Sequence, residues 1–238
     1  MIELIMQSQP DDESCGPTSL YAIYQYYGHE ISQEAVFREV ERSLSGGTLS
    51  PMLGIHALSQ GFDVIIYINN LNIFDPTWFR LGKSDPDFVY KKLEEQMIHK
   101  RSPAILQESK TYLKYLGLGG QIYFSSLDVP LLKSYFKKKI PILTALSATY
   151  LYRCPRERFT RNGKAIFDDV KGTPCGHFVV LCGYDTHHRL IVVADPHREN
   201  PLSHDNYYKV SSHRLINAIM LGVTTYDANL LIIKPKMR

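Results

Sequence analysis

Residues 174–196 read PCGHFVVLCGYDTHHRLIVVADP. Two apolar runs, 177–185 and 189–196, flank a polar turn at 186–188, and this pattern predicts a β-hairpin. His177 begins the first strand and Asp195 ends the second. Because a hairpin returns the chain to the end from which it started, we expect these two side chains to lie together. An Asp in that position can accept a hydrogen bond from the imidazole and so fix its tautomer and orientation.

A second stretch, residues 9–20, reads QPDDESCGPTSL. Pro17 near the first turn and Gly28 after the last predict a helix that begins at Cys15. A helix N-terminus favours the thiolate, which is the nucleophilic form of cysteine. Gly16 has no side chain, and we expect it to leave room for a substrate carbonyl to approach the backbone.

Together these stretches predict a site for nucleophilic catalysis. Cys15 would be the nucleophile, His177 the general base and Asp195 the residue that orients the base. The Cys15 N–H and the Gln9 side-chain amide could both donate to a developing oxyanion. Each residue alone has an ordinary structural explanation, such as a small apolar residue at a helix start or an Asp-Pro that ends a strand. The occurrence of all of them in one chain, in this order, favours the catalytic interpretation.

Composition and charge narrow the classes of partner. The chain has 238 residues, of which 44% are hydrophobic and 21% charged, as in an ordinary globular protein. The net charge is +3, basic runs such as Lys137–Lys139 are short, and no base-stacking motif accompanies them. We therefore expect no nucleic acid and no membrane span, and we make no prediction of oligomeric state.

The N-terminal residues contain no basic region, apolar stretch or cleavage site typical of a secretory signal. This predicts a cytoplasmic protein, although export by a non-classical route would leave no signature to recognise. The four cysteines, at positions 15, 154, 175 and 182, contain no C-x-x-C pair, which favours reduced thiols. Cys15, Cys175 and His177 could supply three metal ligands, but structural zinc usually takes four. We predict neither a metal nor a cofactor.

The order of elements predicts an α+β fold in a single domain, residues 1–238. A helical lobe would span about 1–116 and a β-rich lobe about 120–238. Within the first lobe we expect helices that begin near Cys15, Gln33, Pro51, Asp85 and Leu106, and a strand at 63–70. Within the second we expect strands at 120–126, 141–152, 177–185, 189–196 and 229–235, a helix after Asp128 and another at 212–220.

Three motifs resemble those of a known family. Gln-x5-Cys-Gly-Pro-Thr-Ser-Leu from Gln9, Gly-His-Phe-Val-Val-Leu from Gly176 and Ala-Asp-Pro from Ala194 look like the peptidases that cleave double-glycine leaders from bacteriocin precursors. The chain is similar to their free-standing relatives without transporter domains. The resemblance implies a papain-like fold, in which a helical lobe that carries Cys15 packs on an antiparallel sheet. It also implies that Gln9 is the oxyanion residue.

The resemblance is carried by residues 7–28 and 174–196. The segment from about 45 to 140 matches no motif of the family, and it could cover the cleft or select the substrate. Three function classes follow. The first is a cysteine peptidase that works through a thioester acyl-enzyme, with a leader or other small peptide as one possible substrate. The second is an acyltransferase or deamidase with the same triad. The third is an inactive papain-like binding module, which is disfavoured because all four catalytic positions hold competent residue types.

Overall fold

The computed structural model describes residues 1–43, 46–80, 83–160, 165–225 and 227–236. The helices are α1 (Cys15–Tyr26), α2 (Gln33–Glu39), α3 (Ser50–Ser59), α4 (Pro86–His99), α5 (Pro103–Gly117), α6 (Val129–Lys137), α7 (Ala148–Tyr152) and α8 (Ser212–Leu221), with 3-10 turns at Pro76–Trp78 and Gly222–Thr225. The strands are β1 (Phe62–Ile68), β2 (Phe79–Arg80), β3 (Lys83–Ser84), β4 (Gln121–Tyr123), β5 (Ile142–Ser147), β6 (Glu157–Phe159), β7 (Ala165–Phe167), β8 (Gly176–Asp185), β9 (Leu190–Ala194), β10 (Tyr207–Ser211) and β11 (Asn229–Pro235).

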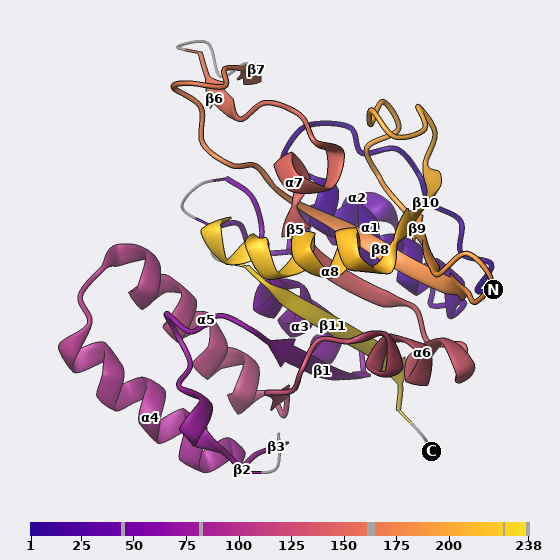
Figure 1. The fold of residues 1–238 in the computed structure, drawn as a ribbon. Helices are drawn as coiled ribbons and strands as arrows, with labels where there is room; N and C mark the ends of the chain where they lie inside the picture. Colours follow the sequence, from indigo (N-terminus) through magenta and orange to yellow (C-terminus); the bar gives the residue numbers. More distant parts are fainter. Residues whose placement is uncertain (44–45, 81–82, 161–164, 226, 237–238) are drawn as a thin grey trace.

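Within the described ranges, nine strands form one sheet in the order β10-β9-β8-β5-β11-β1-β4-β3-β2. The pairings are antiparallel except that of β1 with β4, which is parallel. Helices α1 and α3 pack against the sheet on one side and α6 and α8 on the other (Figure 1). β6 and β7 form a separate two-stranded sheet that projects beyond α7 at the top of Figure 1. The fold is thus α+β with a large, mainly antiparallel sheet, as the order of elements predicts.

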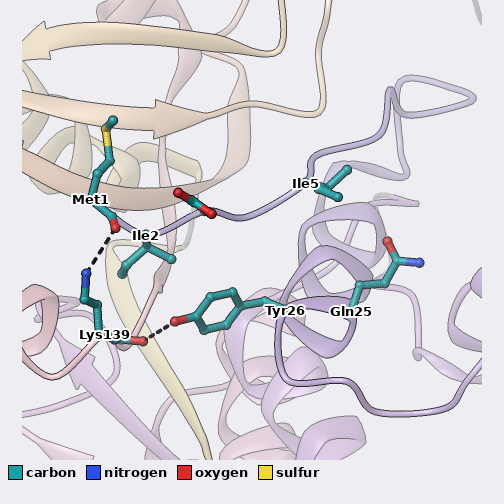
Figure 2. Close-up of a pocket in the computed structure, with 7 residues that line it drawn as sticks. Met1, Ile2, Ile5, Gln25, Tyr26 and Lys139 are labelled. Atoms are coloured by element: carbon teal, nitrogen blue, oxygen red, sulfur yellow. Dashed lines mark hydrogen bonds between the residues drawn. The ribbon is translucent and has the colours of Figure 1, made fainter.

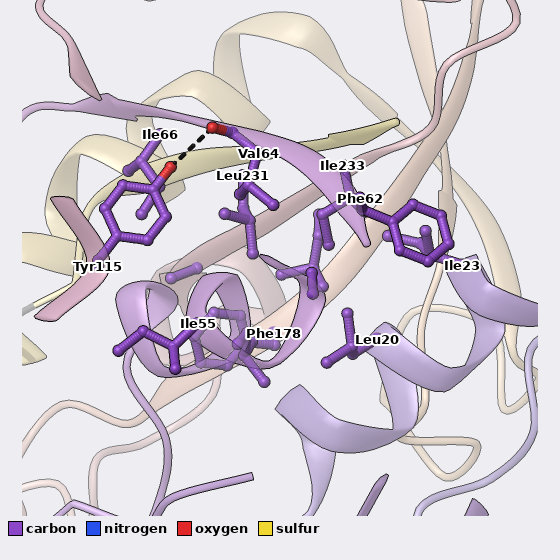
Figure 3. Close-up of a cluster of buried hydrophobic side chains, with 14 of the residues drawn as sticks. Leu20, Ile23, Ile55, Phe62, Val64, Ile66, Tyr115, Phe178, Leu231 and Ile233 are labelled. Carbon is purple, nitrogen blue, oxygen red and sulfur yellow. Dashed lines mark hydrogen bonds between the residues drawn. The ribbon is translucent and has the colours of Figure 1, made fainter. Parts of the chain in front are cut away.

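Both faces of the sheet are buried, which explains the continuous apolar runs of the central strands. On β8, Phe178 and Val180 face one hydrophobic cluster, while Val179 and Leu181 face another. The first cluster joins the sheet to α1 and α3, where Leu20 packs near Phe178 (Figure 3). The second joins it to α8. This alternation follows from the period of two along a strand.

Several predicted helix starts are confirmed, together with their caps. The Ser32 side chain accepts a hydrogen bond from the backbone N–H of Ala35, three residues into α2. Asp85 caps α4 in the same way, and Asp128 caps α6. A polar side chain just before each helix satisfies backbone donors that have no partner within the helix.

The structure differs from the sequence prediction at 141–152, which we expected to form one strand. The strand ends at Ser147, whose hydroxyl accepts a hydrogen bond from the Tyr150 N–H and caps α7. The strand expected at 120–126 is confined to Gln121–Tyr123. β10 was not predicted, and it extends the sheet by pairing with β9.

The N-terminal segment packs in extended form against the body of the protein. Ile2 donates its N–H to the carbonyl of Cys182 at 2.8 Å. Near it, Met1, Tyr26 and Lys139 line a cavity of about 430 Å³, in which Lys139 Nζ donates to the Met1 carbonyl (Figure 2). This cavity is separate from the one that contains Cys15 and His177. Among the described helices, none has the length and apolar character needed to cross a bilayer.

A buried carboxyl of α5 has no cationic partner among the residues that the structure describes. Glu108 is 2% exposed, and its Oε1 accepts a hydrogen bond from Asn70 Nδ2 at 3.1 Å. Burial, followed by the charge of Asp227, raises the pKa of Glu108 to about 9. The folded state therefore holds a proton that the unfolded chain releases near the ordinary pKa of Glu, so this group destabilises the fold progressively as pH rises from about 4.5 to 9.

We therefore predict that Glu108→Gln stabilises the protein at alkaline pH. The variant should have the same free energy of unfolding as the wild type near pH 5. It should exceed the wild type by roughly 2–5 kcal/mol near pH 9, because the neutral amide carries no ionisation cost. Urea denaturation at a series of pH values measures the difference. Glu94→Gln, at an exposed position of α4, is the matched control, and a constant difference between Glu108→Gln and the wild type across pH would contradict the prediction.

Candidate active site

Cys15 is the first residue of α1, as its sequence context predicts. Ser14 precedes the helix, and the side chain of Cys15 is 9% exposed. The structure gives Gly16 a packing role that the sequence analysis did not predict. A Cβ atom there would lie 2.2 Å from Thr48 Oγ1 and 3.3 Å from a ring carbon of Phe178. The glycine thus permits close packing of the Thr48 segment against the start of α1, in addition to any space it leaves for a substrate.

His177 is the second residue of β8 and lies opposite Leu146 of β5 in the sheet. Its Nε2 is 2.7 Å from Oδ1 of Asp195, which directly follows β9. The predicted hairpin of β8 and β9 is confirmed, with Val180 opposite Ala194. The structure thus brings His177 and Asp195 together as the sequence indicates.

Cys15 and His177 line the same cavity, and an electrostatic interaction with Cys15 also acts on the His177 ring. Because Asp195 occupies Nε2, the nitrogen available to Cys15 is Nδ1. Burial alone lowers the pKa of His177, but the charge of Asp195, the hydrogen bond to it and the contact with Cys15 outweigh burial, so the net pKa is raised. Burial likewise raises the pKa of Asp195, and the charge of His177 and hydrogen bonds from its neighbours reverse this to a net lowering. The pair is therefore stabilised in its charged form.

Asp195 has partners that the sequence did not reveal. Its Oδ2 accepts hydrogen bonds from the hydroxyls of Tyr152 and Tyr208, each at 2.7 Å. Its Oδ1 accepts a hydrogen bond from the backbone N–H of His197 at 2.8 Å in addition to that from His177. Polar Lys209 and Ser211 flank apolar Val210 in the sequence, and this alternation could have identified Tyr208, two residues before Val210, as inward-facing. No sequence signal distinguishes Tyr152.

Gln9 lies beside the loop that carries Asp195. Its backbone N–H donates to the carbonyl of Pro196 at 2.9 Å, and its side-chain Nε2 donates to the carbonyl of Asp11 at 2.8 Å. Its Oε1 is buried and makes no hydrogen bond within the described part of the chain. The side chain is not one of the described residues that line the cavity of Cys15 and His177. One of the two amide hydrogens remains available for another acceptor.

Cys15 and His177 line one cavity of about 520 Å³. Its wall is contributed by separate segments, among them Thr48 before α3, Cys175 before β8 and Asp227 before β11. Asp227 is 5% exposed, and its carboxylate accepts hydrogen bonds from the backbone N–H and the hydroxyl of Ser50. Burial raises the pKa of Asp227 to about 6. Asp227 thereby ties the start of α3 to the cavity wall, a link that the sequence analysis did not find.

The remaining thiols differ from Cys15 in their surroundings. Cys182 is buried between the sheet and the helices, and burial raises its pKa to about 12. Burial, followed by the charge of Glu157, raises the pKa of Cys175 to about 12 and also raises the pKa of Cys154. Among the described residues there is no group of three or more His, Cys, Asp or Glu side chains placed so that they could hold a metal ion.

Comparison with known proteins places these motifs in context. The model of the Peptidase_C39 like family matches residues 1–216. The match therefore includes the segment 45–140, in which the sequence alone shows no motif. No curated protein matches the chain.

Two solved structures are similar over nearly the full chain. One is described as a candidate C39-like peptidase from Bacillus anthracis, with 16% identity, a TM-score of 0.45, and coverage of 99% of this chain and 96% of that one. The other is xylellain, a cysteine protease from Xylella fastidiosa, with 13% identity, a TM-score of 0.35, and coverage of 99% and 88%. The family match over most of the chain confirms the resemblance, and the observed arrangement of helices around a mainly antiparallel sheet confirms the α+β class predicted from the sequence. The chain belongs to the Peptidase_C39 like family.

Proposed function

We propose that this protein is a cysteine peptidase in which Cys15 attacks a peptide carbonyl, His177 transfers the proton and Asp195 orients His177. The observation that carries the proposal is that Cys15 and His177 line the same cavity, while the far nitrogen of the His177 ring is 2.7 Å from Asp195. Family membership supports the same chemistry. The substrate is a peptide or protein segment, and the resemblance to leader peptidases supports a leader or other small peptide.

The first half of the reaction forms an acyl-enzyme. The Cys15 thiolate, paired with protonated His177, adds to the carbonyl carbon and produces a tetrahedral oxyanion. The Cys15 backbone N–H and the Gln9 side-chain amide stabilise this oxyanion, provided that the Gln9 amide turns its second hydrogen toward it. When the C–N bond breaks, Nδ1 of His177 gives its proton to the leaving amine, and the acyl group remains on Sγ as a thioester.

The second half hydrolyses the thioester. Neutral His177 accepts a proton on Nδ1 from a water molecule, and the oxygen attacks the thioester carbonyl. The C–S bond then breaks, releasing the carboxylic acid and restoring the thiolate and the protonated ring. Asp195 keeps Nε2 protonated throughout, so that Nδ1 alone exchanges the proton with substrate and water. This assignment follows from the use of Nε2 by Asp195.

We predict that Cys15→Ala abolishes peptide cleavage. A library of leader-like and unbiased peptides is incubated with each protein, and products are identified by mass spectrometry. The variant should lose at least about 10³-fold in rate, because the acyl-enzyme cannot form. Cys154→Ala removes a partly buried thiol outside the site and should retain wild-type activity.

The products also separate the peptidase from its alternatives. Cleaved peptides that carry a new carboxylate support the peptidase. Uncleaved peptides in which a side-chain amide has become a carboxylate, with uptake of water and release of ammonia, would indicate a deamidase. Acyl transfer to an added amine in preference to water would indicate a transferase. Cleavage that survives Cys15→Ala would contradict the proposal.

We further predict that iodoacetamide labels Cys15 first. At pH 6.5 the other thiols are held protonated by burial and nearby carboxylates, whereas Cys15 lies beside His177 in an accessible cavity. Labelling at Cys15 should be at least about tenfold faster than at Cys154, as measured by peptide mapping over time. His177→Ala should remove most of this difference. Equal rates at the two cysteines of the wild type would contradict an activated thiol.

A further inference from the structure

The carboxylate of Asp195 is completely enclosed by hydrogen-bond donors. It is 0% exposed, and each of its oxygens accepts two hydrogen bonds. A carboxylate offers about four acceptor positions, so the donors present occupy all of them. Addition of a proton to Asp195 would place a donor against a donor. The arrangement therefore favours the ionised form of Asp195, because a proton on either oxygen would displace at least one of the donors.

The donors come from distant parts of the chain. Tyr152 ends α7, Tyr208 lies on β10, and the others are the His177 ring on β8 and the His197 N–H after β9. Tyr208 lies directly opposite Val193 of β9, and Asp195 is two residues beyond Val193. Because side chains repeat their direction every second residue, Tyr208 and Asp195 project from the same face of the sheet. The sheet register therefore determines the contact between them.

The two tyrosines form hydrogen bonds to one oxygen of Asp195, and His177 forms a hydrogen bond to the other. Both hydroxyls donate to Oδ2, which leaves Oδ1 for His177 and the His197 N–H. A turn of the carboxylate about its Cβ–Cγ bond would break all of these hydrogen bonds. From this geometry we infer that Tyr152 and Tyr208 are positioning residues, which hold Asp195 ionised and turned toward His177. The inference rests on the proposed function in one respect, namely that His177 exchanges a proton with Cys15.

An alternative is that the two tyrosines only fill the core. Their rings do contribute to the hydrophobic cluster around α8, and they are 9% and 8% exposed. Replacement by Phe separates the two roles, because it keeps the ring and removes only the hydroxyl. Tyr207 supplies a control on the same strand. Its hydroxyl accepts a hydrogen bond from the Met6 N–H and donates to the Leu4 carbonyl, and it makes no described contact with Asp195.

The ionised form of Asp195 loses stabilisation when the hydroxyls are removed. Hydrogen bonds to a charged group favour that form, so their loss raises the pKa of Asp195. The groups around Asp195 are His177 on β8, Tyr152 on α7, Tyr208 on β10 and His197 in the following loop. Burial raises the pKa of Tyr208, and the charge of Arg214 on α8 partly opposes this rise. Of these groups, only the hydroxyls change in the Phe variants. Protonation of Asp195, which breaks the ion pair with His177, would then occur at a higher pH than in the wild type.

The experiment compares Tyr152→Phe, Tyr208→Phe, the double variant and Tyr207→Phe. Two profiles are measured against pH: kcat/KM with a cleaved peptide, and the rate of iodoacetamide labelling at Cys15, which needs no substrate. Each single variant should lose about threefold to tenfold in kcat/KM through kcat, and the double variant about 100-fold, since one hydroxyl can partly compensate for the other. The acidic limb of both profiles should move up by about one pH unit in the double variant. Tyr207→Phe should match the wild type.

Thermal unfolding and circular dichroism establish that each variant is folded, and the single variants suffice if the double variant is not. If folded Tyr152→Phe and Tyr208→Phe keep the wild-type labelling profile, the inference is overturned, and the tyrosines only fill the core. A wild type that labels fast at Cys15 but cleaves no peptide would overturn the proposed function, while the labelling profiles would still test the positioning role.

Discussion

The antiparallel pairing of β8 with β9 is the constraint on which the rest of the site depends. It places His177, at the start of one strand, next to Asp195, at the end of the other. The pairing contains a bulge between Leu181 and Gly183, so that Leu181 still lies opposite Val193 while the strand continues to the turn. A shift by one residue would move every side chain to the opposite face. The register of this hairpin therefore fixes whether an imidazole and a carboxylate meet.

Burial of a carboxylate is costly, and the surroundings of Asp195 explain how the fold tolerates it. An unpaired charge in the interior costs several kcal/mol, whereas a charge with its acceptor positions filled loses much less. The charge of His177 and the hydroxyls of Tyr152 and Tyr208 provide this compensation. Glu108 is the contrasting case. Its carboxyl group accepts a hydrogen bond from the neutral side chain of Asn70, and its pKa is raised instead. The same fold thus keeps one buried carboxyl ionised and favours the neutral form of another.

The sequence predicts what depends on local signals and misses what depends on tertiary contacts. The His177–Asp195 hairpin and the helix that starts at Cys15 could be predicted, because both follow from short-range patterns of apolar residues, Pro and Gly. The role of Tyr152 could not be predicted from the sequence. Ser147 ends a strand and caps a helix within an apolar run that resembles one continuous strand. Asp227 was also missed, since its partner Ser50 is far away in sequence.

The cavity wall and the hairpin of β8 and β9 are connected through the strands of one sheet. Asp227 precedes β11 and holds Ser50 at the start of α3, while β11 pairs with β5 and β5 pairs with β8. Thr48, two residues before Ser50, packs against Gly16 beside Cys15. Cys15 on α1 and His177 on β8 are therefore related through one continuous set of contacts. Since packed interiors transmit small displacements, a change at Asp227 would alter the cavity that Cys15 and His177 line, through the packing of Ser50 and Thr48.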